Sequence, residues 1–339
     1  IRMETIRESI FFKILEDRNK TRHSQALFIK SFEPFITARI PVRVGYSGGN
    51  FPDTVSYSSR LNIWVSTGIS MKNRYWNGFG IEKPQEGAMI PITCEINFPK
   101  KGINRTIAGA FAIDDSGETI VLHRGKIGGG RKGIGKNLFE NSYRGNWFDI
   151  LDGDTENSLA LIGSLSSHRL PLYVSNFVHE VARIKSLSDT EVGRTKKYQI
   201  NNNFKKEFSG KKRYKAKSHI DAECNHGLVV NELASYLTKA GHKVGNDTNR
   251  DLYIFTGQSK IKTLFEFKMD ASTTNIYSGI GQLLITTLDF ETKPNLVLVL
   301  PKEGNRTRAK LAKLGIKVLL FGWEKDIPIF SNMSALLES

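Results

Sequence analysis

The chain is poor in cysteine, has no long apolar run and carries fewer acidic than basic residues. Its two cysteines, Cys94 and Cys224, are far apart and lack the close spacing of zinc ligands. Two cysteines are also too few for a disulfide framework, so a reducing cytoplasm is the expected location. No apolar run approaches the length of a bilayer span, so we expect no membrane insertion.

The charge balance indicates the kind of partner. The 339 residues include 49 Lys and Arg against 34 Asp and Glu, which gives a formal net charge of +15. A basic surface of this size attracts polyanions and gains free energy when their counterions are released. Nucleic acid is therefore the first candidate partner.

Length and changes of composition predict two domains joined by a linker. Residues 1–187 combine a helical repeat at Thr5–Glu16 with short β-like runs and a closing helix at Leu172–Leu187, which predicts a mainly β (α+β) amino-terminal DNA-recognition domain. Residues 188–218 are rich in Lys and Arg and too poor in large aliphatics to fold alone, so we interpret them as a basic linker. Residues 219–339 mix helical and strand patterns, which predicts an α/β domain.

Charged residues gather on two short segments of this third region. Residues 250–255 and 263–268 are predicted to be adjacent strands of a hairpin. Because side chains alternate across a strand, Glu266 and Lys268 share one face. Asp251 begins the first strand and is expected at the same end of the sheet.

This combination of charges suits metal-assisted chemistry. Two close carboxylates repel each other, so one would stay protonated near neutral pH without a partner. A hard cation such as Mg²⁺ removes that penalty and takes oxygen ligands. A nearby lysine aligns the attacking water or stabilises a negatively charged transition state. Together these groups are the minimal set for phosphodiester hydrolysis.

These residues resemble the motif of the PD-(D/E)xK nuclease superfamily, which includes many restriction endonucleases. Asp251 takes the acidic position, although Arg250 precedes it where the motif has proline, and Glu266-Phe267-Lys268 takes the Glu-x-Lys position. Glu232, on a predicted helix before the hairpin, matches an extra acidic residue of many members. Gln282, on a predicted helix after it, matches a glutamine that many members carry.

The resemblance implies a restriction-endonuclease-like core, a mixed sheet flanked by helices. It implies that Asp251, Glu266 and the Phe267 carbonyl hold Mg²⁺, for which Mn²⁺ could substitute, while Lys268 positions or activates water. Glu232 and Gln282 complete the predicted catalytic set. The implied substrate is double-stranded DNA, and a homodimer is expected because symmetric cutting of both strands needs two active sites.

Two segments of the first domain and one of the linker are predicted to contact DNA. Residues 71–80 mix cations, amides and aromatics in a loop-like setting that can stack on bases or plug the end of a barrel. Residues 121–136 are basic and glycine-rich, which lets a backbone approach phosphates, although a solvated loop is the alternative. The candidate DNA-binding residues are Arg74, Tyr75, Trp76, Asn77, Arg124, Lys126, Arg131, Lys132, Lys136, Lys211, Lys212 and Arg213.

The glycine-rich segment also fits part of a nucleotide-binding pattern. Gly130–Lys136 satisfies the first seven positions of the P-loop pattern, G-x-x-x-x-G-K. The next residue is Asn137, where a P-loop has the Ser or Thr that binds Mg²⁺. We therefore do not expect ATP binding.

The predicted function is that of a Mg²⁺-dependent double-stranded DNA endonuclease, of the type II restriction kind, whose first domain reads sequence or base modification. Two alternatives stay open. A structure-specific repair nuclease would use the same catalytic residues on forks, mismatches or ends. In a non-catalytic DNA-binding protein, Glu266 and Lys268 would form only a solvated salt bridge.

Overall fold

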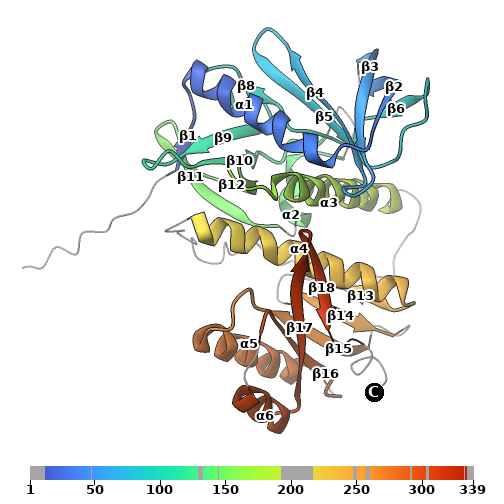
Figure 1. Cartoon of the computed structure of the whole chain (residues 1–339), viewed down its shortest axis with the longest axis vertical. Helices are drawn as coiled ribbons and strands as arrows, with labels where there is room; N and C mark the ends of the chain where they lie inside the picture. The colour runs from blue at the N-terminus through green and yellow to red at the C-terminus, as the bar shows by residue number, and fades with distance from the viewer. Residues whose placement is uncertain are drawn as a thin grey trace, which may run out of the picture. The chain divides into compact units, whose positions relative to one another are not determined.

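The computed structural model describes residues 12–46, 48–128, 133–143, 145–191, 217–246, 250–256, 260–290, 292–302, 305–331 and 333. In this part of the chain the structure is mixed α/β, as the sequence predicts. It divides into two compact units, Ile1–Asp221 and Ala222–Ser339 (Figure 1). None of the helices it describes is both long and apolar enough to cross a bilayer.

A closed barrel forms one part of the amino-terminal unit, with the strand order β1-β11-β12-β10-β9. Its strands are β1 (Lys13–Ile14), β9 (Gly109–Ile113), β10 (Thr119–His123), β11 (Trp147–Asp152) and β12 (Thr155–Ser164). The pairings are antiparallel except between β1 and β11. Closure pairs each of these strands on both sides, so the barrel presents no open edge.

A second, seven-stranded sheet completes the β structure of this unit. Its strands run in the order β6-β2-β3-β4-β5-β7, and β8 pairs with β5 beyond this path. They are β2 (Ala38–Tyr46), β3 (Gly49–Ser58), β4 (Ile63–Ser70), β5 (Arg74–Gly80), β6 (Met89–Pro91), β7 (Cys94–Glu95) and β8 (Phe98–Pro99). β5 thus lies between β4 and two short strands.

Helices α1 (Arg18–Phe32), α2 (Lys136–Ser142) and α3 (Leu170–Glu191) belong to the same unit, with a 3-10 turn at Glu33–Phe35. The helix predicted at Thr5–Glu16 is wrong over residues 12–16, and residues 1–11 lie outside the described part. Ile14 pairs with Ala112 in the barrel, so strand pairing outweighs the local helical periodicity. The helix instead begins after Asp17, whose carboxylate caps it by accepting the Lys20 backbone N–H at 2.8 Å.

The carboxy-terminal unit is built on a six-stranded mixed sheet with the order β13-β14-β15-β16-β17-β18. Pairing is parallel between β15, β16 and β17 and antiparallel elsewhere. The strands are β13 (Lys243–Gly245), β14 (Leu252–Phe255), β15 (Ile261–Phe267), β16 (Asn295–Leu300), β17 (Ile316–Glu324) and β18 (Ile327–Ser331). The two predicted hairpin strands are therefore confirmed as the adjacent antiparallel pair β14 and β15.

Helices cover both faces of this sheet. α4 (Lys217–Lys239), which enters this unit at Ala222, packs Val229 and Leu233 against Phe265 and its neighbours on one face. α5 (Thr273–Thr286), a 3-10 turn at Thr287–Asp289 and α6 (Asn305–Lys313) follow in the chain. Residues of α5 and α6 pack with Leu264 and Leu298 on the other face. The candidate active-site residues lie at one end of this three-layer arrangement.

Helices also enter both ends of the predicted linker, residues 188–218. α3 extends to Glu191 and α4 begins at Lys217. Residues 192–216, and with them the DNA-binding candidates Lys211, Lys212 and Arg213, lie outside the described part of the chain.

Candidate active site

Strand register brings Asp251 next to the Glu-x-Lys segment. Leu252 pairs with Phe265 in the antiparallel β14–β15 ladder, so Asp251, one residue earlier, falls beside Glu266 and Phe267. The Phe267 backbone N–H donates a hydrogen bond to Asp251 Oδ2 at 3.0 Å. Phe265 and Phe267 are buried in the core under α4, which leaves Glu266 on the alternate face as the strand period requires.

Lys268 ties the end of β15 to α5. Its Nζ donates to Glu266 Oε1 at 2.8 Å and to Gln282 Oε1 at 2.6 Å. Its backbone N–H donates to the Val299 carbonyl at 3.0 Å, which extends the pairing with β16 by one residue. The side chains are 7% exposed for Glu266 and 17% for Lys268, so this ion pair is shielded from water. The structure therefore brings three of the predicted site residues into one hydrogen-bonded chain.

A glycine sets how closely α5 approaches this group. A Cβ added to Gly279 would lie 2.6 Å from Leu298 Cδ1 and 3.4 Å from Lys268 Cε. Because real Cβ atoms do not come within 2.6 Å of another heavy atom, a larger residue here would shift its neighbours. α5 is capped at Ser272, whose hydroxyl accepts the Asn275 backbone N–H. Capping and close packing together hold Gln282 within reach of Lys268.

The structure adds a histidine that the sequence argument missed. His226 Nε2 on α4 lies 3.3 Å from Asp251 Oδ2. His226 precedes Val229, Val230 and Leu233 by three, four and seven residues, which is the spacing of one helix face. The sequence contains this spacing and could have indicated the histidine. The helix predicted around Glu232 begins at Leu228, however, and therefore excludes His226.

Glu232 takes a different place on the same helix. It lies six residues after His226, roughly 120° around the helix axis at 3.6 residues per turn. Its side chain is half-buried and takes no part in the hydrogen bonds of Asp251 and Glu266 described above. Among the described residues, the helix side chain that touches Asp251 is thus His226.

The two carboxylates respond to their surroundings in opposite directions. Burial by itself raises the pKa of Asp251, but hydrogen bonds from His226 and from the Phe267 backbone, with the Lys268 charge, bring that pKa below its usual value. Burial and the neighbouring Asp251 charge raise the pKa of Glu266 to about 7, and the hydrogen bond from Lys268 opposes them only in part. Near neutral pH Asp251 is therefore ionised while Glu266 is only partly ionised, with the charges of Lys268 and His226 opposing the effect of burial.

The free oxygens of the two carboxylates show whether the site could hold a metal ion. Oδ1 of Asp251 and Oε2 of Glu266 accept no hydrogen bond from any residue that the structure describes. Two free carboxylate oxygens fit a hard divalent cation. No group of three or more His, Cys, Asp and Glu side chains suited to a metal occurs within the described ranges. The resemblance implies that the Phe267 carbonyl would join the two carboxylates as a ligand.

The structure corrects the prediction of a DNA-contacting loop at residues 71–80. Arg74–Gly80 forms strand β5, where Trp76 is 3% exposed and Asn77 is fully buried. Trp76 packs in a hydrophobic cluster of the sheet and Asn77 bonds to Gln25 of α1, so neither side chain can stack on a base. Arg74 and Tyr75 are half-buried, and Tyr75 lines a pocket.

Arg124 is a second correction. Its guanidinium donates to Asp152 Oδ2 at 2.7 Å and to Oδ1 at 3.2 Å, and the residue is 6% exposed. Arg105 donates to the same carboxylate at 3.1 Å. Burial raises the pKa of Asp152, but the two guanidinium groups outweigh it and lower that pKa below its usual value. Arg124 is buried and paired with Asp152, so it cannot reach a phosphate.

The remaining basic candidates of the glycine-rich segment differ in their positions. Lys126 is exposed and donates to the Arg105 carbonyl at 2.6 Å. Lys136 begins α2, is largely exposed and lies 3.5 Å from Glu140. Arg131 and Lys132 lie outside the described residues. Only Lys126 and Lys136 of this group can therefore be placed on the surface.

Comparison with models of protein families, with curated proteins and with solved structures found no match.

Proposed function

We propose that the chain is a Mg²⁺-dependent double-stranded DNA endonuclease with a restriction-endonuclease-like carboxy-terminal core. The observation that carries the proposal is the group of Asp251, Glu266 and Lys268 at the ends of two paired strands. Apart from the edge strands β13 and β18, the elements of this unit follow the order helix, hairpin strands, helix, strand, helix and strand, which is the layout that the resemblance implies. The net charge of +15 supports a polyanionic substrate.

Each residue has a defined part in the proposed reaction. Asp251 and Glu266, with the Phe267 carbonyl, would hold Mg²⁺, which supplies a Lewis acid for the phosphoryl oxygens when bound. His226 and the Phe267 N–H fix Oδ2 of Asp251, so that Oδ1 faces no competing donor among the described residues. These contacts orient one carboxylate oxygen before substrate binds.

Lys268 acts on the water and the phosphate. Its ammonium group, held by Glu266 and Gln282, carries positive charge to the place where the attacking oxygen and the phosphoryl oxygens become more negative. Water attacks the phosphorus atom, the bond to one ester oxygen breaks, and a phosphate end and a hydroxyl end result. The attacking water gives up a proton to solvent, and the leaving oxygen takes up a proton from solvent to form the hydroxyl end. Gln282 serves as a positioning residue because it acts through Lys268.

The test compares a lysine on β15 with the lysine that directly follows this strand. Lys268→Ala removes the central ammonium group, and Lys262→Ala removes an exposed lysine six residues earlier on β15. With Mg²⁺ and methylated or unmethylated phage DNA, we expect Lys268→Ala to slow cutting about 10²- to 10³-fold. Lys262→Ala should cut like the unaltered protein, and both variants should bind duplex DNA similarly. Equal cutting by the two variants contradicts the proposal.

Substrate choice and fragment ends sharpen the assignment. A restriction enzyme cuts an intact duplex at defined sequences, which sequencing of the fragment ends reveals. A repair nuclease requires forks, mismatches or free ends, and a non-catalytic binding protein shows no metal-dependent cutting to lose. The expected homodimer is checked by sedimentation of the protein with and without DNA.

A further inference from the structure

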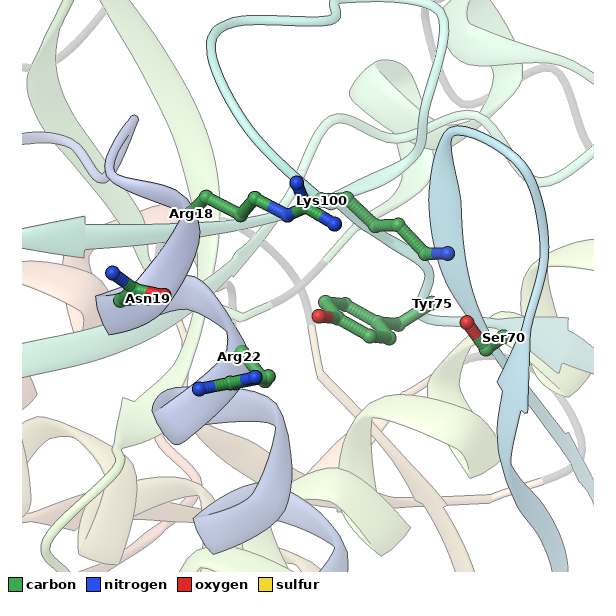
Figure 2. Close-up of a pocket in the computed structure, with 6 residues that line it drawn as sticks. All are labelled: Arg18, Asn19, Arg22, Ser70, Tyr75 and Lys100. Atoms are coloured by element: carbon green, nitrogen blue, oxygen red, sulfur yellow. The ribbon is translucent and has the colours of Figure 1, made fainter.

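The amino-terminal unit contains a strongly basic pocket of about 540 Å³. This volume lies within the usual range of ligand sites, about 300–1,000 Å³. No acidic residue lines it, and its residues come from helix α1, from two neighbouring strands and from the residue after a third strand. Figure 2 shows the lining residues Arg18, Asn19, Arg22, Ser70, Tyr75 and Lys100.

Packing of α1 along β5 builds the pocket. Phe28 of α1 contacts Phe79 of β5, with ring centroids 6.3 Å apart. One helical turn earlier, Gln25 bonds to Asn77, two residues earlier on the same face of the strand. Continuing in this direction, the next positions are Arg22 and Arg18 on the helix and Tyr75 on the strand.

Two further strands bring the remaining side chains to Tyr75. Ser70 of β4 pairs directly with Tyr75, and directly paired residues share one face of a sheet. On the other side Tyr75 pairs with Phe98 of β8, and Lys100 follows that strand. The Lys100 backbone N–H donates to the Asn73 carbonyl at 3.1 Å, and this hydrogen bond fixes the position of the Lys100 backbone.

Buried amides hold α1 on the sheet next to the residues that line the pocket. Asn77 Nδ2 donates to Gln25 Oε1 at 3.2 Å and to the Ile96 carbonyl at 2.9 Å, while its backbone N–H donates to Asn97 Oδ1 at 2.8 Å. These groups are fully satisfied and almost completely buried, so they fix α1 on the sheet. The cations at the pocket are thereby presented by a rigid frame.

The charge of the pocket is not balanced by the residues that the structure describes. Arg18, Arg22 and Lys100 form no ion pair with any carboxylate of the described residues. Lys100 Nζ instead lies 5.7 Å from the centre of the Tyr75 ring. Asp17, next to Arg18, is engaged in capping the helix. Like charges gathered without a counter-charge repel each other, and a bound anion removes that cost.

We propose that this pocket binds a phosphate group, and that in the cell this is a backbone phosphate of the DNA that the enzyme holds. Two guanidinium groups one helical turn apart can each offer paired N–H donors to phosphate oxygens. Lys100 adds a point charge, and Ser70, Tyr75 and Asn19 offer neutral donors of the kind that contact DNA backbones. The choice of DNA as the source rests on the proposed function, whereas the phosphate chemistry does not.

The test measures how duplex binding depends on salt in protein without Mg²⁺. We expect Arg22→Ala to weaken binding roughly tenfold, since a charge-assisted hydrogen bond is lost. We also expect the slope of log affinity against log salt to fall by about 1, as for the loss of one phosphate contact. Lys30→Ala, an exposed cation at the other end of α1, is the matched control and should leave the slope unchanged. Lys100→Gln repeats the test from a separate element.

Small probes separate the two sources of phosphate. Calorimetric titration uses inorganic phosphate and a nucleoside 5′-monophosphate with the unaltered protein and with Arg22→Ala. Loss of monophosphate binding in Arg22→Ala with an unchanged duplex slope supports the phosphate site but assigns it to a free nucleotide. An unchanged slope in Arg22→Ala and Lys100→Gln, with unchanged binding of both small probes, overturns the proposal.

The same experiments separate this pocket from the proposed active site. If Lys268→Ala cuts like Lys262→Ala while Arg22→Ala still lowers the salt slope, the nuclease assignment fails and the phosphate pocket stands. If cutting depends on Lys268 but the salt slope and the small probes ignore Arg22 and Lys100, the pocket assignment fails alone.

Discussion

Each unit of the protein buries a carboxylate beside a cation, and the two arrangements differ in their balance. Asp152, in the amino-terminal unit, accepts hydrogen bonds from Arg124 and Arg105 and has a lowered pKa. Glu266, in the carboxy-terminal unit, has one lysine but shares its surroundings with Asp251, and its pKa rises to about 7. Two guanidinium groups keep Asp152 charged. At Glu266 the opposing charges do not offset the effects of burial and of Asp251 on its pKa.

This difference distinguishes the structural ion pair of Asp152 from the ion pair of Glu266, which we propose to be catalytic. A buried acid with two guanidinium partners is stable as a charged group and needs nothing further. A buried acid with a raised pKa stores unfavourable energy that a cation could release, and such groups gather at functional sites. The comparison explains why Arg124 is unavailable to DNA although its sequence context suggested it.

The largest effect is expected from removing the balanced acid. Asp152→Ala leaves Arg124 buried without its partner, which should cost about 3–5 kcal/mol of the free energy of unfolding. Asp149→Ala, on the same strand and half-exposed, changes the same charge and should stay within about 0.5 kcal/mol. Denaturant unfolding measures both, and equal losses would refute the structural assignment of Asp152.

A buried histidine beside this ion pair should make the amino-terminal unit sensitive to acid. Burial lowers the pKa of His123 to about 4, helped by the Arg124 charge and opposed by the hydrogen bond to the Glu95 carbonyl. The unfolded chain binds a proton below about pH 6.5 and the folded chain does not. Stability is thus complete above pH 6.5 and falls by on the order of 3 kcal/mol as the pH drops to 4.

His123→Gln isolates this contribution, because glutamine can donate to the Glu95 carbonyl but does not titrate. His123 Nδ1 accepts the Gly125 backbone N–H at 3.0 Å, so protonation would also break that bond. We expect the free energy of unfolding of His123→Gln to vary less between pH 6.5 and 4. A variant with the same pH dependence as the unaltered protein would show that His123 is not the sensitive group.

Divalent cations should stabilise only the unbalanced site. Mg²⁺ or Ca²⁺ at a hundred times its dissociation constant adds about 2.7 kcal/mol to a folded state that binds it. Hydrogen exchange followed by mass spectrometry should show slower exchange in β14, β15 and α5 and no change in the β9–β12 strands. Asp251→Asn should remove the effect, and chelator should reverse it. Equal protection in both units would argue for unspecific binding.

The smallest effect is expected from neutralising the unbalanced acid. An acid with a raised pKa binds more protons when folded, so between pH 4.5 and 7 its contribution to stability falls as the pH rises. Glu266→Gln removes this fall but also loses the ion pair with Lys268. In chelator at pH 8 we expect a change within about 1 kcal/mol, towards higher stability. If Glu266→Gln lowered the free energy of unfolding as much as Asp152→Ala, the two acids would have the same structural role, contrary to our interpretation.

The sequence predicted those parts of the site that depend on local period. Glu266 and Lys268 share a strand face because side chains alternate, and Asp251 meets them because neighbouring strands pair. Gln282 was placed by its order in the motif, and the contact with Lys268 agrees with that placement. These relations span few residues or follow from one pairing, so a pattern can reveal them.

The sequence could not predict relations that depend on tertiary packing. Trp76 and Asn77 have the composition of a surface loop, but packing within the sheet and against α1 buries them. Arg124 looks like a phosphate ligand until Asp152, far along the chain, is seen beside it. The basic pocket joins Arg18 to Lys100 through three strands and a helix. No local period or spacing connects such residues.

The alternation along β15 makes the fold and the chemistry inseparable. Phe265 and Phe267 fill the core on one side, while Glu266 and Lys268 stand on the other. Inserting or deleting a single residue near this end of the strand would turn the aromatic rings towards the face that carries Glu266 and Lys268 and drive the charges into the apolar layer. Evolution can therefore exchange side chains in this segment, but it cannot change the segment's length by one residue without losing folding and chemistry together.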